Sequence, residues 1–171
     1  MRIDAYLPEF TVSERHTIHV AVPPERAFPV ARHLDFNASR ITRALFRMRG
    51  LPSGDLRLDA LLGDGPGFAI LEEQPPEEFV LGLMARRARP VEIENAEAFR
   101  AFAPTQGLRI AWNFHLLPTD SGTLVSTETR VQCLGATTRR LFRLYWLAIR
   151  PFSGWIRYEM LRILKRQAEP S

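Results

Sequence analysis

The strongest constraint on the fold is a long segment near the C-terminus, residues 137–167, in which apolar residues recur at helical spacing. At about 100° per residue, they form one broad stripe along a single helix, opposite a cationic stripe. The apolar stripe consists of Phe142, Tyr145, Ile149, Phe152, Ile156, Met160 and Ile163, and the cationic stripe of Arg139, Arg140, Arg143, Arg150, Arg157 and Lys165. A helix of this kind must bury its apolar face, so we expect it to lie against a sheet.

Pro151 lies inside this expected helix and removes the backbone donor that would reach the carbonyl of Leu147. The flexible pair Ser153-Gly154 follows directly, so we expect a kink at this point. A kinked helix cannot press evenly on a sheet along its whole length. Two arrangements remain open, namely a cavity between helix and sheet, or a bent helix over a full core.

The chain of 171 residues is long enough to bury a sizeable core without disulfides or metals, so we expect one domain, residues 1–171. Within it we expect a short leader, residues 1–12, and a polar tail, residues 168–171. No uncharged apolar run approaches the roughly 18 residues of a membrane helix. Asp4 and Glu9 interrupt the start of the chain, where an export signal needs an apolar core. Together with the lone Cys133, these features favour a cytoplasmic location.

Basic charge is concentrated in the final helix. Residues 135–171 carry 8 Lys and Arg against 2 Asp and Glu, whereas the preceding residues carry 15 against 17. A basic helix face suits anionic lipid, nucleic acid or simply solvent. The aromatic and basic residues do not interleave as they do in proteins that bind single-stranded nucleic acid. We therefore expect no nucleic-acid partner, while peripheral contact with a membrane remains open.

Alternation of apolar and polar residues predicts the strands. Residues 14–22 place Ile18, Val20 and Val22 on one face, and residues 108–117 alternate in the same way. Because strands and helices do not alternate along the chain, we expect an antiparallel sheet with the helices on one side, an α+β fold. The expected strands are residues 14–22, 68–73, 78–85, 108–117 and 123–133, and the expected shorter helices begin at Pro24 and span residues 37–48, 55–62 and 95–103.

Three stretches carry a family resemblance that spans nearly the whole chain. They are residues 21–28 (AVPPERAF) after the first strand, residues 126–131 (STETRV) on the last strand, and residues 145–161 in the final helix. In these the chain resembles the START-like (SRPBCC) superfamily, the helix-grip group that includes polyketide cyclases and lipid-transfer domains. The resemblance implies a curved antiparallel sheet wrapped around a long kinked C-terminal helix, with a ligand cavity between them. It implies a container rather than a particular reaction.

The residues expected to line this cavity are mostly apolar, as in other sites for hydrophobic ligands. The alternative is that the same side chains fill the core. Thr127 and Thr129 can offer hydroxyls to a ligand or can bond to neighbouring backbone. The expected ligand-binding set is Phe68, Ile70, Phe79, Leu81, Leu83, Trp112, Phe114, Thr127 and Thr129 from the sheet, with Tyr145, Ile149, Phe152 and Ile156 from the helix.

Glu128 and Arg130 alternate with these threonines, so we expect them to face away as an outward cross-strand ion pair. In the opposite register they would be buried and would suit the orientation of a polar substrate. His115 is expected at the surface, on the face opposite Trp112. No catalytic motif, metal-ligand cluster or phosphate-binding loop is recognisable, so we expect no cofactor, no metal and no assigned catalytic residue.

Three functions follow from these patterns. The first is binding of a small hydrophobic molecule such as a lipid, polyketide or isoprenoid. The second is a polyketide cyclase or dehydratase, for which the sequence supplies only Glu128, Arg130 and Tyr145 as ionisable candidates. The third is a membrane-surface or protein-interaction module that uses the Arg-rich helix face with Trp146 and Trp155. Either a monomer or a homodimer is compatible with each of them.

Overall fold

The computed structural model describes residues 1–35, 57–58, 62, 67–87 and 89–169. The described strands form one antiparallel sheet in the order β1-β6-β5-β3-β2, and the short β4 pairs with β3. The expected helix at residues 37–48, and most of that at residues 55–62, lies outside the described residues. The strands are β1 (Val12–Val20), β2 (Ala69–Gln74), β3 (Glu78–Arg86), β4 (Arg89–Val91), β5 (Gly107–Thr119) and β6 (Gly122–Leu134).

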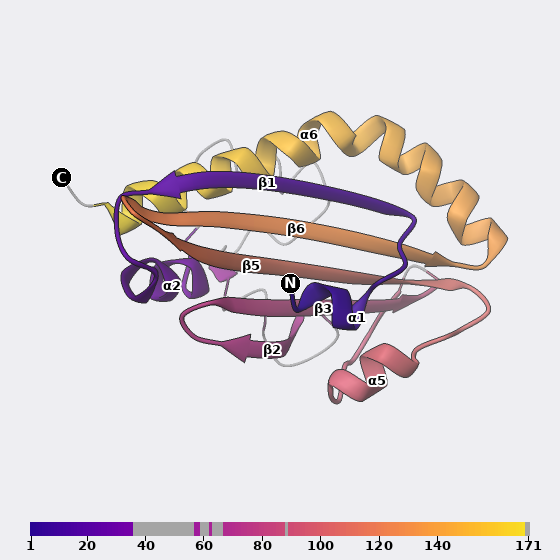
Figure 1. Ribbon diagram of the computed structural model, residues 1–171. Coiled ribbons are helices and arrows are strands. Elements are labelled where there is room, and N and C mark those ends of the chain that lie inside the picture. Colours follow the sequence, from indigo (N-terminus) through magenta and orange to yellow (C-terminus); the bar gives the residue numbers. More distant parts are fainter. Residues whose placement is uncertain (36–56, 59–61, 63–66, 88, 170–171) are drawn as a thin grey trace.

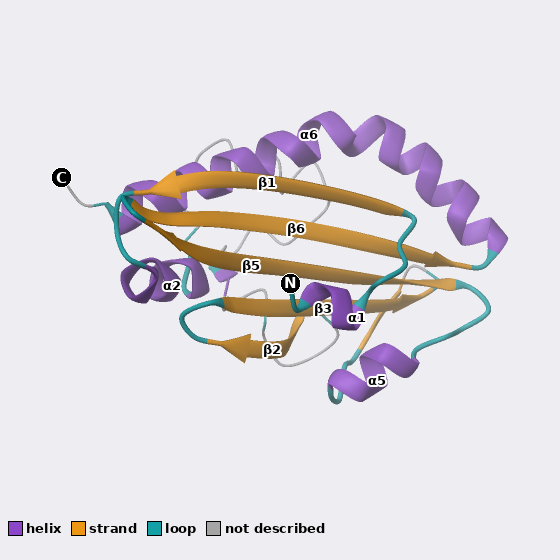
Figure 2. Cartoon of the chain, viewed as in Figure 1, coloured by secondary structure: helices purple, strands orange, loops and turns teal. Residues whose placement is uncertain are grey.

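Helices cover both faces of this sheet (Figure 2). One face, called the inner face below, carries α2 and the long α6, whereas α1 and α5 pack on the outer face. The expectation of helices on one side is therefore wrong for α1 and α5. The physical reason is that the outer face also presents apolar side chains, Val80, Met84 and Ala111, which need cover. The helices are α1 (Ile3–Tyr6), α2 (Pro24–Arg32), α5 (Ala96–Ala101) and α6 (Ala136–Ala168).

The register of the central strands decides which side chains reach each face. Trp112 and Phe114 of β5 point inward into the main core, and the intervening Asn113 points outward, where its amide donates to Glu78 at 2.6 Å. His115 also points outward, as expected, but it is half-buried rather than fully exposed. Period-two alternation therefore placed these side chains correctly.

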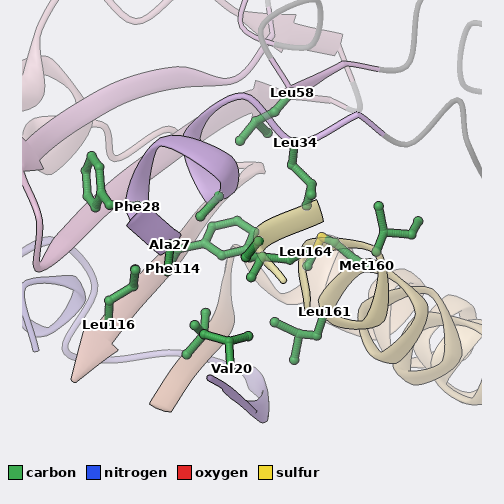
Figure 3. Close-up of a cluster of buried hydrophobic side chains, with 14 of the residues drawn as sticks. Val20, Ala27, Phe28, Leu34, Leu58, Phe114, Leu116, Met160, Leu161 and Leu164 are labelled. Carbon is green, nitrogen blue, oxygen red and sulfur yellow. The ribbon is translucent and has the colours of Figure 1, made fainter. Parts of the chain in front are cut away.

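The second half of α6 closes the main core. Met160, Leu161 and Leu164 are buried in the same cluster as Val20 and Phe114. Figure 3 shows these helix side chains pointing into the cluster between the sheet and α2. This half of the helix buries its apolar side chains, as the sequence pattern predicts.

The first half of α6 does not follow that prediction. The helix is continuous across Pro151, but it arches, and its first half rises away from the sheet (Figure 1). Tyr145 and Phe152, expected to be buried, are 48% and 41% exposed, and Leu147 is 74% exposed. Burial of the whole stripe is therefore wrong, because only the second half of the arched helix reaches the core.

On the outer face, the segment expected to be a leader packs as part of the structure. Ile3, Tyr6 and Leu7 are buried with Phe99 of α5. The α5 helix begins at an N-cap, Asn95, whose Oδ1 accepts a hydrogen bond from the Ala98 amide at 2.8 Å.

The N-terminal segment, residues 1–7, also covers Glu128 and Arg130. As expected, both face away from the threonines, but the pair lies along one strand and is buried rather than exposed. Arg130 donates from Nε to Glu128 at 2.6 Å and from Nη1 to the Leu7 carbonyl at 3.1 Å, and its Nη2 pairs with Asp4 at 2.7 Å. Burial lowers the pKa of Arg130, but its bonds to Glu128 and Asp4 outweigh this and raise the pKa above its ordinary value. The ion pair therefore fastens the N-terminal segment to the sheet.

Replacing Arg130 should destabilise the fold, because Glu128 would remain buried without its counter-charge. We predict that Arg130→Met lowers the free energy of unfolding by about 2–4 kcal/mol in urea titrations. Arg89→Met, at an exposed position on β4, is the matched control and should change it by less than about 0.5 kcal/mol. Equal effects of the two substitutions would show that the Arg130 interactions contribute no stability.

His115 should make stability depend on pH. Burial lowers its pKa below the ordinary value of 6.5, although Glu78 acts in the opposite direction. The unfolded state therefore binds the proton more readily, so stability is full above about pH 6.5 and falls as the pH drops through the lower, folded-state pKa. We predict that His115→Gln flattens the decline in unfolding free energy between about pH 7 and pH 5. An unchanged slope in the variant would contradict this.

Candidate functional site

The expected ligand-binding residues separate into two groups along the inner face. The first group lies where α6 and α2 close the core, and its members are packed against one another. Phe79 stacks on Phe114 with ring centroids 5.0 Å apart, and Phe68 lies edge-on to Trp112 at 5.8 Å. This group contains Phe68, Phe79, Leu81, Trp112, Phe114 and Thr127; Ile156 of α6 is also buried.

Thr127 shows that the polar groups of this first group are hydrogen-bonded within the protein. Its hydroxyl accepts a hydrogen bond from Trp112 Nε1 at 2.7 Å and donates to the Asn113 carbonyl at 2.9 Å. The hydroxyl is fully buried, so both of its bonds are made within the protein. Of the two roles open to this threonine, the structure shows the internal one.

The second group retains exposed surface. Leu83 and Thr129 on the sheet and Ile149 on α6 are half-buried, and Tyr145 and Phe152 are exposed. Ile70, on the edge strand β2, is also partly exposed, at 38%. The structure thus brings the first group together in the core, and of the second group it leaves Ile70 apart, on the edge strand β2 at the opposite side of the sheet from β1.

A polar cluster marks the boundary between the two groups. Glu14 and His16 project from β1 toward α6, where Arg157 Nη1 lies 3.0 Å from Glu14 Oε2 and 2.5 Å from the buried Ser153 hydroxyl. His16 Nε2 lies 3.3 Å from Glu14 Oε1. Arg157 was expected on the solvated stripe of the helix, and that expectation is wrong because Glu14 draws its guanidinium into the helix–sheet contact.

Gly154 allows this close approach. A Cβ atom at this position would lie 2.9 Å from Glu14 Oε1 and 3.7 Å from the His16 ring, so the absence of a side chain gives the carboxylate room beside the helix. Sequence reasoning missed Glu14, Ser153 and Arg157 as a group. The Ser153-Gly154 pair was noticed only as a source of flexibility, and 143 positions separate Glu14 from Arg157.

A separate open cavity of about 410 Å³ lies at the start of α6. Arg139 and Arg143 line it together with Cys133. Burial raises the pKa of the Cys133 thiol, outweighing the opposing effects of Thr11 and the two arginines. The remaining lining residues are Glu9, Phe10, Thr11, Gln132, Leu134 and Gly135.

The described residues place further limits on the chemistry. Among them, no three His, Cys, Asp or Glu side chains gather in a way that could hold a metal ion. Glu128 and Arg130, two of the three ionisable candidates for catalysis, lie on the outer face under α1. None of the helices in the described part of the chain is long and apolar enough to cross a bilayer.

No protein-family model and no curated protein matches the chain. Among solved structures, 38 chains match. Protein MLL2253 from Mesorhizobium loti is 15% identical over 91% of this chain and 98% of its own, with a TM-score of 0.46. A conserved protein from Geobacillus kaustophilus is 9% identical over 92% and 95%, with a TM-score of 0.48. Protein NE0264 from Nitrosomonas europaea is 15% identical over 91% and 96%, with a TM-score of 0.41.

The architecture itself defines the class. A curved antiparallel sheet that carries a long C-terminal helix on its inner face, with short helices beside it, is an α+β fold consistent with the helix-grip type (Figure 1).

Proposed function

We propose that this chain is a START-like protein that binds a small hydrophobic molecule of the lipid, polyketide or isoprenoid class between the first half of α6 and the inner face of the sheet. The observation that supports the proposal is that the two halves of α6 are packed differently. Its second half is sealed into the core, whereas its first half leaves apolar side chains of both helix and sheet partly exposed.

The position of these side chains suits an apolar ligand. Ile149 lies on the side of α6 that continues, one and two turns later, into the buried Ser153 and Ile156, so it is directed toward the sheet. Leu83 and Thr129 belong to the inward-facing rows of their strands. A ligand lying among these three residues would remove apolar surface from water, at about 25 cal/mol for each Å² buried.

The polar cluster sets the inner limit of this region. Arg157 and Glu14 join helix to strand there, so a ligand would lie on the far side of the cluster from the packed core. In the strand register, Glu14 lies opposite Thr129 at the edge of the proposed ligand region, whereas His16 lies opposite the buried Thr127 on the core side of the cluster. The cyclase or dehydratase alternative has less support, because Glu128 and Arg130 are occupied on the other face.

Fluorescence titration with N-phenylnaphthylamine tests the proposal, because this neutral apolar probe brightens when it leaves water. We predict saturable binding, and we predict that Ile149→Lys weakens it at least tenfold by placing a charge among the apolar groups. Leu147→Lys is the matched control. It carries the same new charge two residues away on the outward side of α6, and it should change probe affinity by less than about twofold.

The alternative outcomes are distinct. Absence of saturable binding in the natural chain would overturn the proposal, as would equal effects of the two lysine substitutions. Circular dichroism and thermal unfolding of both variants show whether each is folded, so that a lost fold is not mistaken for a lost site.

A further inference from the structure

The outward side of α6 carries a continuous apolar stripe that begins in its first half and extends into its second half. Residues 144, 147, 151, 155 and 158 recur at spacings of three and four, so their side chains lie along one line of the helix. Leu144 and Leu147 are 67% and 74% exposed, and Trp155 and Tyr158 are exposed by about half. This outer stripe faces away from the side that carries the buried Ser153, and it lies on the arch that rises from the sheet (Figure 1).

The outer stripe is accompanied by unbalanced positive charge. Arg139, Arg140, Arg143 and Arg150 are exposed, and none of them makes an ion pair with a residue that the structure describes. Residues 136–158 contain no Asp or Glu, and the first acidic side chain on the helix is Glu159. The same part of the helix thus presents apolar and cationic surface without any compensating carboxylate.

We propose that the outward side of α6 between residues 139 and 158 docks this protein onto an anionic lipid bilayer, with the outer stripe inserted at the interface and the arginines at the headgroups. Leucine and tryptophan on one side of a helix, bordered by arginine, suit binding at the boundary between lipid headgroups and acyl chains. Arg139 and Arg143 also line the cavity at the start of α6, together with Glu9.

A second copy of the chain is a poorer occupant for the outer stripe. A twofold contact through this stripe would bring the arginines of both copies together without any acidic partner from residues 136–158. Nucleic acid would satisfy the charge but not the exposed leucines. Charge complementarity and apolar content together therefore select an anionic membrane surface.

Vesicle flotation tests this proposal with the full chain. The test compares vesicles of phosphatidylcholine alone with vesicles in which about one-third of the lipid is phosphatidylserine. Binding should require the anionic lipid and should weaken in high salt. Brominated acyl chains should quench Trp155 fluorescence, and the quenching should be largely lost in Trp155→Phe.

Two variants and one control isolate the surface. The triple variant Arg140→Gln/Arg143→Gln/Arg150→Gln should lose at least tenfold in partitioning, as should Leu144→Ser/Leu147→Ser, which changes only exposed side chains. Arg86→Gln/Arg87→Gln/Arg89→Gln removes the same charge at exposed positions near the turn between β3 and β4 and should lose less than twofold. Far-UV circular dichroism and thermal unfolding should be unchanged in all three.

Several results would overturn the proposal. They are absence of flotation with anionic vesicles, equal binding to neutral vesicles, equal loss in the control, and a concentration-dependent dimer that Leu144→Ser/Leu147→Ser abolishes. The titration with N-phenylnaphthylamine is performed without vesicles, and these variants should leave it unchanged. Failure of membrane docking and failure of ligand binding are therefore separable.

Discussion

The packing of the second half of α6 against the inner face of the sheet is the interaction on which the rest of the structure depends. Met160 and Leu164 enter the same apolar cluster as Trp112 and Phe114, and removal of this surface from water is the largest favourable contribution available to the fold. Because α6 is one continuous helix, this anchored half also fixes where the first half projects. The exposed part of the helix is positioned by the buried part.

The cover on the outer face has a consequence for function. Glu128 and Arg130 would be attractive catalytic candidates if they faced a cavity, but residues at the N-terminus enclose them on the other side of the sheet. A buried ion pair is costly to leave without partners, so its bonds to Ser13, Leu7 and Asp4 are what make it tolerable there. These charges hold the N-terminal segment in place and leave the inner face largely apolar.

The strands could be predicted from the sequence because their evidence is local. Alternation along residues 108–117 assigned Trp112 and His115 to opposite faces, and the structure agrees. The helix was predicted equally well as an element. Its burial was not, because apolar residues occupy most of the circumference between Leu141 and Trp155, and periodicity does not say which part of a helix meets its sheet.

The candidate site was predictable only in part, for a related reason. Residues such as Phe79 and Thr127 were correctly assigned to the inner face, but whether an inward residue meets a neighbour or open space depends on how far the helix stands from the sheet. The contact between Glu14 and Arg157 was beyond reach, because it joins the first strand to the last helix. Such a contact requires the tertiary arrangement, which the spacing of residues within one element does not contain.

The two halves of α6 differ in how tightly they are packed against the rest of the protein. Hydrogen–deuterium exchange measured by mass spectrometry tests this directly. Amides of residues 156–168 should exchange slowly, because they open only when the whole protein unfolds. Amides of residues 140–150 should exchange much faster, through local opening of the first half of α6. Equal protection along the whole helix would contradict the account.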